Sequence, residues 1–155
     1  MSRIISAGKS PRIKIDTIEG DLSVVGWDGE DILIKTDEDE LSLQHNGDEV
    51  VFSGTDDVSL RIPRDASLAI GKISGDMALR GVMGSIEIQE INNDLSMRDV
   101  GNVAIEAIHA DFSLRGAKGN LYIKNVGGDV SVRDVEGNIT RAGRTTSGNF
   151  YQRIT

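Results

Sequence analysis

The stretches GDMALRGVM (residues 75–83) and GDVSVRDVE (residues 128–136) are two copies of a nine-residue unit that fills residues 66–145. Each unit reads as a small pair, an apolar residue, a polar residue, a second apolar residue, two polar residues, a third apolar residue and one linker residue. A fixed internal period indicates a repeat architecture, in which each unit buries its apolar side by stacking on its neighbours. The sequence therefore specifies an architecture more strongly than it specifies a function.

The spacing of the apolar residues within a unit predicts β-strands joined at corners. The first two lie two positions apart, which places them on one face of a strand, and the third follows a bend. Small residues open each unit and favour turns, because Gly and Asn tolerate positive φ. The units begin at Ala66, Gly75, Gly84, Asn93, Gly101, Ala110, Gly119, Gly128 and Gly137. The predicted core is Leu68, Ile70, Ile73, Met77, Leu79, Val82, Ile86, Ile88, Ile91, Leu95, Met97, Val100, Val103, Ile105, Ile108, Phe112, Leu114, Ala117, Leu121, Ile123, Val126, Val130, Val132 and Val135.

Alternate units differ at their second position, and this difference predicts the length of one turn of the chain. One set carries Asp76, Asp94, Asp111 and Asp129, and the other carries Ser85, Asn102, Asn120 and Asn138. The aspartates are 18, 17 and 18 residues apart (94−76, 111−94 and 129−111). Two units therefore make one rung of about 18 residues, and equivalent residues stack at about 4.8 Å. The predicted fold class is all-β: a short single-stranded β-solenoid with two strands per rung.

The chain outside the array is predicted to form its two ends. Residues 11–19 and 20–28 fit the unit, with Trp27 in the third apolar place, and Asn46-Gly47 predicts a hairpin. We expect residues 29–63 to be antiparallel strands that cap the N-terminal end, because a bare terminal rung exposes apolar surface and unpaired backbone groups. After residue 137 the pattern fades, residues 145–149 look like a turn, and residues 150–155 form either a last strand or a truncated end.

We therefore expect one domain over residues 1–155. It comprises N-terminal rungs and capping hairpins at 11–63, the regular array at 64–145, and a C-terminal cap or cut end at 146–155.

The composition fits one acidic domain with an aliphatic core. The chain has 155 residues, a net charge of −8, 4% aromatic residues and no cysteine. The lack of cysteine excludes a disulfide framework and a thiolate metal site, and no apolar run is long enough for a membrane span. An acidic balance argues against nucleic acid, which needs clustered Lys and Arg. Residues 1–6 show no signal-peptide pattern, so the chain as given is expected in the cytoplasm, or at the cell surface if a signal was trimmed.

Three stretches and the repeat together resemble the bacterial putative-adhesin domain family, DUF4097. The stretches are GWD at residues 26–28, VSLRIP at residues 58–63 and ISGD at residues 73–76, followed by the Gly-Asp units of the array. The resemblance covers residues 11–145. It implies a single-stranded β-solenoid with a non-catalytic role, and the adhesin label of the family is itself inferred from architecture.

Four arginines recur four positions after the aspartates and form the one candidate interaction site. They are Arg80, Arg98, Arg115 and Arg133. Stacked at about 5 Å, their charges repel by about 1 kcal/mol per neighbouring pair even in water. The two interpretations are an anion-binding strip, for example for an acidic polysaccharide, and a solvated surface with interleaved ion pairs to residues such as Asp99 and Asp134.

No residue pattern points to catalysis, a cofactor or a metal. His45 and His109 lie on different elements without a cysteine partner, and the serines at 96, 113 and 131 have no neighbouring base. Only Gly127-Gly128 with Asp129 resembles the calcium β-roll motif. The predicted function is a non-enzymatic structural or adhesin-like module with a protein or polysaccharide partner. The alternatives are a scaffold that self-assembles through the solenoid ends, a calcium-binding β-roll, and a polysaccharide-active β-helix enzyme.

Overall fold

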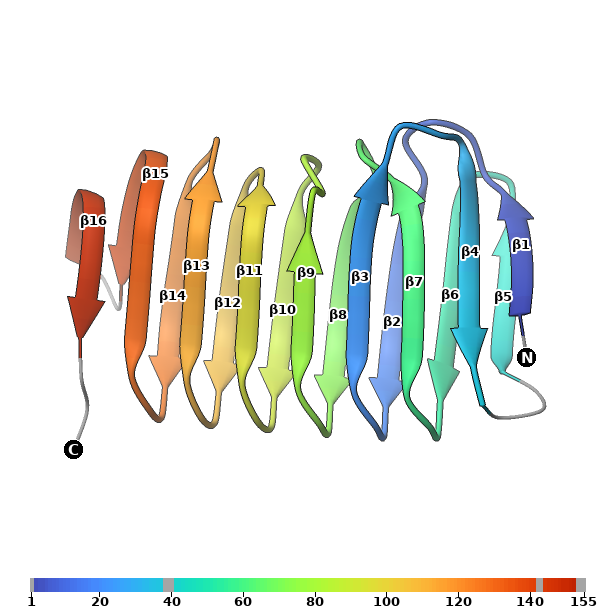
Figure 1. The fold of residues 1–155 in the computed structure, drawn as a ribbon, viewed down its shortest axis with the longest axis horizontal. Helices are drawn as coiled ribbons and strands as arrows, with labels where there is room; N and C mark the ends of the chain where they lie inside the picture. The colour runs from blue at the N-terminus through green and yellow to red at the C-terminus, as the bar shows by residue number, and fades with distance from the viewer. Residues whose placement is uncertain (1, 38–40, 142–143, 153–155) are drawn as a thin grey trace.

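The structure, a computed structural model, describes residues 2–37, 41–141 and 144–152, and every helix or strand in these ranges is a β-strand. Figure 1 shows them as two layers of strands that lie back to back. The strands are β1 Ser2–Ser6, β2 Arg12–Ile18, β3 Leu22–Trp27, β4 Asp31–Thr36, β5 Ser42–Asn46, β6 Glu49–Gly54, β7 Val58–Pro63, β8 Ser67–Ile73, β9 Met77–Arg80, β10 Ile86–Ile91, β11 Leu95–Val100, β12 Val103–Ile108, β13 Phe112–Ala117, β14 Leu121–Val126, β15 Val130–Arg141 and β16 Arg144–Gln152.

From β8 to β15, strand pairing shows that every second strand lies in the same layer, next to the strand two before it. The order is β1-β4-β7-β3-β9-β11-β13-β15-β14-β12-β10-β8-β2-β6-β5, with β16 paired to β15. Strands β9, β11, β13 and β15 are parallel neighbours in one layer, and β8, β10, β12 and β14 are parallel neighbours in the other. Leu95 pairs with Met77 and with Phe112, 18 and 17 positions away (95−77 and 112−95). The arrangement is therefore all-β and solenoid-like.

The aspartates at the second position of alternate units lie in one column, as predicted, and hydrogen bonds link its members. The backbone N–H of Asp94 donates to Asp76 Oδ1 at 3.0 Å, and that of Asp111 donates to Asp94 Oδ1 at 2.9 Å. Asp129 continues the series by donating to Asp111 Oδ1 at 2.8 Å. Each carboxylate therefore accepts a hydrogen bond from the backbone N–H of the next aspartate in the column, and this links neighbouring rungs.

The N-terminal strands do not stack in chain order, which corrects one expectation. Strands β2 and β3 pair in parallel with β8 and β9, so Leu22 lies beside Met77, 55 residues further along the chain. Strands β6 and β7 then pair in parallel with the outer sides of β2 and β3. The expectation of antiparallel strands over residues 29–63 holds for β4 and β5, and for the hairpin that joins β5 to β6. It is wrong for the pairing of β6 with β2 and of β7 with β3, which is parallel.

Strand β1 was not predicted, and it pairs antiparallel with β4 at one edge. Strands β5 and β1 are thus the last strands of the two layers at the N-terminal end (Figure 1).

The C-terminal end also differs from the expectation. The faded unit after residue 137 is the second half of β15, where Leu121 of β14 pairs with Ile139. The turn predicted at residues 145–149 is wrong, because β16 begins at Arg144 and runs antiparallel to β15. The last three residues of the predicted final strand, 153–155, lie outside the described residues.

The core matches the apolar pattern of the repeat. All the predicted core residues are buried except Val126, which is half-buried and packs against the others. Ile105, for example, is 0% exposed and stacks between Ile88 and Ile123 of the neighbouring strands. Burial of apolar surface is worth about 25 cal/mol per Å², so these aliphatic stacks are the main source of stability.

The glycines that open the units have a different role from the one predicted. Among the described residues, the glycines with positive φ are Gly8, Gly47, Gly81 and Gly116, and none of them opens a unit. Unit-opening glycines such as Gly101 are instead needed because the neighbouring backbone passes close by: a Cβ there would lie 2.8 Å from the carbonyl carbon of Met83. Positive φ occurs at the other corner, directly after the arginines, where Asp99 has a φ of 52°.

Candidate functional site

Two outer surfaces flank the core, one on each layer. We call the outer surface of β7, β3, β9, β11, β13 and the first half of β15 the β11 face, and the outer surface of β6, β2, β8, β10, β12 and β14 the β12 face. Alternation of buried and exposed residues along each strand sends every second side chain outward. Because neighbouring strands are in register, side chains at equivalent positions form columns that run across the strands.

The β11 face carries the predicted arginine column. Arg80, Arg98, Arg115 and Arg133 are register partners on consecutive strands, and all four side chains are exposed. The column extends beyond the predicted array, because Val25 of β3 pairs with Arg80 on one side and with Arg61 of β7 on the other. Arg61 lies over the ring of Trp27, 4.0 Å from its centroid. We call the residues at this position the arginine column: Arg61, Val25, Arg80, Arg98, Arg115 and Arg133.

Two further columns run parallel to the arginines. One, the serine column, holds small side chains that share register: Ser59, Ser23, Ala78, Ser96, Ser113 and Ser131. The other, the aspartate column, is linked by the hydrogen bonds described above and by two more at 2.7 and 2.8 Å: Asp57, Asp21, Asp76, Asp94, Asp111 and Asp129. The face therefore carries acidic side chains along one edge, basic side chains along the other edge and small side chains between them.

The three columns line two adjoining hollows, which shows that they face the same side. One open hollow of ≈ 410 Å³ lies between the aspartate and serine columns and is lined by Asp76, Ala78 and Ser96, among others. A second, of ≈ 280 Å³, lies between the serine and arginine columns, with Ala78, Ser96 and Arg98 in its lining. Because Ala78 and Ser96 line both hollows, the face forms one shallow trough with oppositely charged rims over β7, β3, β9 and β11.

The arginines of this column are poorly neutralised within the chain. In the described part of the chain, the one ion pair made by Arg80, Arg98, Arg115 or Arg133 joins Arg98 Nε to Asp99 Oδ2 at 3.9 Å, and that arginine side chain is still 63% exposed. Neighbouring guanidinium groups therefore repel one another, by about 1 kcal/mol per pair in water. A row of anions placed over the column would relieve this repulsion.

Basic residues of the β12 face are arranged differently, because each has a carboxylate close by. Lys72 Nζ lies 3.9 Å from Glu90 Oε1, and Lys124 Nζ lies 3.6 Å from Glu106 Oε2. Arg12 contacts Asp48 and Glu49 at 3.4 and 3.5 Å. Interleaved ion pairs were one interpretation of the arginine column, and they describe the β12 face better than the β11 face.

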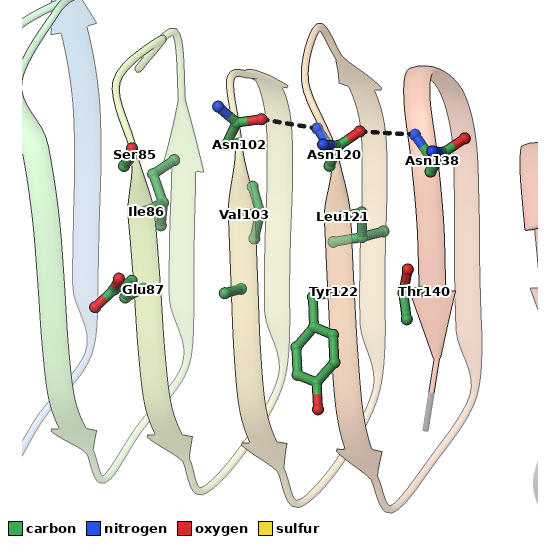
Figure 2. Close-up of a pocket in the computed structure, with 11 residues that line it drawn as sticks. Ser85, Ile86, Glu87, Asn102, Val103, Asn120, Leu121, Tyr122, Asn138 and Thr140 are labelled. Carbon is green, nitrogen blue, oxygen red and sulfur yellow. Dashed lines mark hydrogen bonds between the residues drawn. The ribbon is translucent and has the colours of Figure 1, made fainter. Parts of the chain in front are cut away.

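The β12 face has its own hollow of ≈ 440 Å³, which Figure 2 shows beside a row of asparagines. The backbone N–H of Asn120 donates to Asn102 Oδ1 at 2.8 Å, and that of Asn138 donates to Asn120 Oδ1 at 2.9 Å. The ring of Tyr122 lies below this row and is 38% exposed. Glu87 is the one charged residue among the described residues that line the hollow, so this hollow lacks the opposed charges of the β11 face.

The histidines make local contacts. His45 Nε2 lies 2.8 Å from the carbonyl oxygen of Gly47 in its own hairpin, and His109 Nε2 lies 3.7 Å from Glu90 Oε1. Within residues 2–37 and 41–141, no three His, Asp or Glu side chains are grouped so that they could hold a metal ion. The described ranges also contain no helix that is long and apolar enough to cross a membrane.

Sequence reasoning found the arginine column only in part. It missed Arg61, and it missed Asp21 and Asp57 as members of the aspartate column. The reason is that β3 lies between β7 and β9, and its residues pair with residues of β9 that are 55 positions away in sequence rather than 18. The signal was present in the local pattern: DVSLR at residues 57–61 has the same Asp, Ser and Arg places as DLSMR at residues 94–98.

Comparisons with known proteins give distant likenesses. No protein-family model and no curated protein matches the chain. Two crystal structures are similar: a putative adhesin from Parabacteroides distasonis ATCC 8503, with 12% identity, a TM-score of 0.34 and coverage of 91% of this chain and 78% of that chain, and a putative adhesin from Parabacteroides merdae ATCC 43184, with 12% identity, a TM-score of 0.30 and coverage of 91% and 95%. At this level of similarity, function has to be argued from the surfaces of the chain itself.

Proposed function

We propose that the chain is a non-enzymatic, adhesin-like interaction module whose contact surface is the β11 face. In this proposal residues 1–155 form one short β-solenoid of the kind found in the DUF4097 family, with rungs of about 18 residues and two strands per rung. Residues 11–63 supply N-terminal rungs and capping strands, residues 64–145 the regular array, and residues 146–155 the C-terminal end. The arginine column contacts a partner that presents carboxylates or other anions in a row.

One observation carries the proposal. Among the described residues, Arg98 is the one arginine of the arginine column with a carboxylate within 4.0 Å, whereas Arg12, Lys72 and Lys124 of the β12 face each have one. Unneutralised like charges in register reduce stability. Exposed ion pairs, in contrast, contribute little and can be lost without much effect. A column of arginines with so few ion pairs is therefore better explained by an external anion than by the stability of the chain.

Self-assembly through the solenoid ends remains the alternative. Edge strands expose unpaired backbone groups that can pair with another chain. The strands at the ends, β1, β5 and β16, are antiparallel to their neighbours, so they interrupt the parallel stacking that an end-to-end filament would continue. The β11 face is the stronger candidate for this reason.

Binding of a carboxylate polymer tests the proposal. Fluorescently labelled polygalacturonate is titrated with protein and followed by anisotropy, at protein concentrations at which the chain sediments as a monomer. We expect Arg98→Glu/Arg115→Glu to weaken binding at least about tenfold, because two attractions become repulsions. Lys72→Glu/Lys124→Glu makes the same change of net charge on the β12 face, and we expect it to alter binding less than about twofold.

Equal weakening by both double variants would contradict the proposal, because it would show a response to net charge alone. Unchanged binding by Arg98→Glu/Arg115→Glu would also contradict it, since the arginine column would then not contact the polymer.

A further inference from the structure

The β11 face has a property that the arginine column alone does not explain, namely that its charges are self-complementary. Asp57, Asp21, Asp76, Asp94, Asp111 and Asp129 follow one edge of this face. Arg61, Arg80, Arg98, Arg115 and Arg133 follow the other edge on the same strands, interrupted by Val25. Both columns advance by one strand spacing, about 4.8 Å, at each step. They therefore have the same repeat and nearly the same length.

We propose that the β11 face binds the β11 face of a second copy of this chain. The inference rests on the proposed function, and it identifies the anionic partner of the arginine column as the aspartate column of the other copy. The two copies are related by a two-fold axis that runs across the strands, along the serine column. This rotation turns one face over, exchanges its two edges and leaves the position along the stack unchanged. Arg98 of each copy then lies opposite Asp94 of the other.

The choice of axis follows from the order of the columns. A two-fold axis parallel to the strands would place aspartates on aspartates and arginines on arginines. An axis along the serine column places every arginine over an aspartate, and the two halves of the interface are then identical, as an isologous dimer requires. Small side chains at the centre, such as Ala78 and Ser96, leave the trough open, so the rims make the contacts and water fills the space between them.

A second copy fits this face better than an unrelated anion does. A simple polyanion neutralises the arginine column but is repelled by the aspartate column at the other rim of the same trough. A ligand that satisfies both rims must present bases and acids in two parallel rows with the strand spacing, and a second β11 face does so by construction. The net charge of −8 opposes unspecific association of two copies, so the dimer depends on this local match and weakens as salt screens it.

Sedimentation equilibrium of the full chain at low and high salt tests the inference. We expect a monomer–dimer equilibrium that shifts toward monomer at high salt. Arg98→Glu/Arg115→Glu is expected to raise the dissociation constant by about a hundredfold or more, because four symmetric contacts become repulsive. The matched control, Lys72→Glu/Lys124→Glu, is expected to change it by less than about threefold.

A complementation experiment tests whether the arginine column of one copy faces the aspartate column of the other. In Asp94→Lys/Asp111→Lys both rims are basic at these positions, so this variant should not self-associate but should form a heterodimer with Arg98→Glu/Arg115→Glu. If circular dichroism shows that the lysine variant is not folded, Asp94→Asn/Asp111→Asn replaces it, because an amide oxygen can still accept the N–H of the next strand, as Asn102 does. The asparagine variant should then bind the glutamate variant more tightly than the glutamate variant binds itself.

Several results would overturn the inference: a wild-type chain that stays monomeric at low salt and at the highest soluble concentration, equal weakening by the control, or no heterodimer from two folded variants. Polygalacturonate binding that depends on Arg98 and Arg115 in a strictly monomeric chain would overturn the dimer alone and leave the proposed function intact. If Arg98→Glu/Arg115→Glu changed neither self-association nor polygalacturonate binding, both would be wrong.

Discussion

Replacing Ile105 by Asp is expected to abolish most of the stability of the fold. The side chain is 0% exposed and lies between Ile88 and Ile123 in the aliphatic core. A carboxylate at this position has no polar partner, and an unpaired buried charge costs more than about 4 kcal/mol. Domains of this size have a free energy of unfolding of about 5–15 kcal/mol. We therefore expect Ile105→Asp to be largely unfolded at room temperature, as measured by circular dichroism and urea denaturation.

The control for this variant is Gln89→Asp, which introduces the same residue on the adjacent strand β10. Gln89 is exposed, one position beyond Ile88. Its replacement should change the free energy of unfolding by less than about 0.5 kcal/mol, as is usual for a surface position. A urea midpoint for Ile105→Asp close to that of the wild type would show that Ile105 does not face a packed core.

Replacing Gly101 by Val is expected to have the second largest effect. Gly101 is buried, and its N–H donates to the carbonyl oxygen of Val82 at 3.0 Å. A Cβ there would lie 2.8 Å from the carbonyl carbon of Met83 and 3.0 Å from the carbonyl oxygen of Gly84. These are backbone atoms of the turn between β9 and β10, where the N–H of Met83 donates to the carbonyl oxygen of Arg64 at 2.8 Å, so they cannot move aside without straining this turn. We expect a loss of about 1–3 kcal/mol in the free energy of unfolding.

Ala104→Val is the matched control, since it adds the same side chain to the same segment. Ala104 is half-buried and points outward from β12, where a β-branched residue suits a strand. The urea midpoint of this variant should stay close to that of the wild type. Similar losses for both variants would contradict the close backbone approach at Gly101 and attribute the effect to the added valine itself.

The repeat pattern predicted most of the array because one physical rule governs every unit. Side chains two apart on a strand share a face, so the apolar places identified the core from Leu68 to Val135. The 18-residue spacing of Asp76 and Asp94 predicted their column because the connecting turns are short and uniform. The same pattern also predicted the column of four arginines, but it does not show how few ion pairs they make.

The rest depended on contacts between segments that are distant in sequence. Nothing local in residues 11–28 indicates that β2 and β3 lie between β6–β7 and β8–β9, because a parallel neighbour 18 or 55 residues away makes the same backbone hydrogen bonds. The role of Gly101 was misassigned for a similar reason: the sequence shows that the residue is small but not that the backbone of Met83 passes close to it. The opposed columns of the β11 face could not be predicted from the sequence, because their alignment depends on the register of all six strands.

Engineered disulfides test most directly the stacking of equivalent residues on neighbouring strands, on which the columns and the proposed dimer depend. The chain has no cysteine, so pairs of cysteines can be introduced without competing thiols. Ser96 and Ser113 are register partners on β11 and β13, and Ser131 lies one strand further, on β15.

Neighbouring strands place Cα atoms about 4.8 Å apart, within the range that a disulfide spans, and next-nearest strands place them about 10 Å apart, outside it. On mild oxidation of dilute protein, Ser96→Cys/Ser113→Cys should form an intramolecular disulfide and Ser96→Cys/Ser131→Cys should not, as read by mass spectrometry and non-reducing gels. Efficient bonding in the second pair, or none in the first, would contradict the stacked columns.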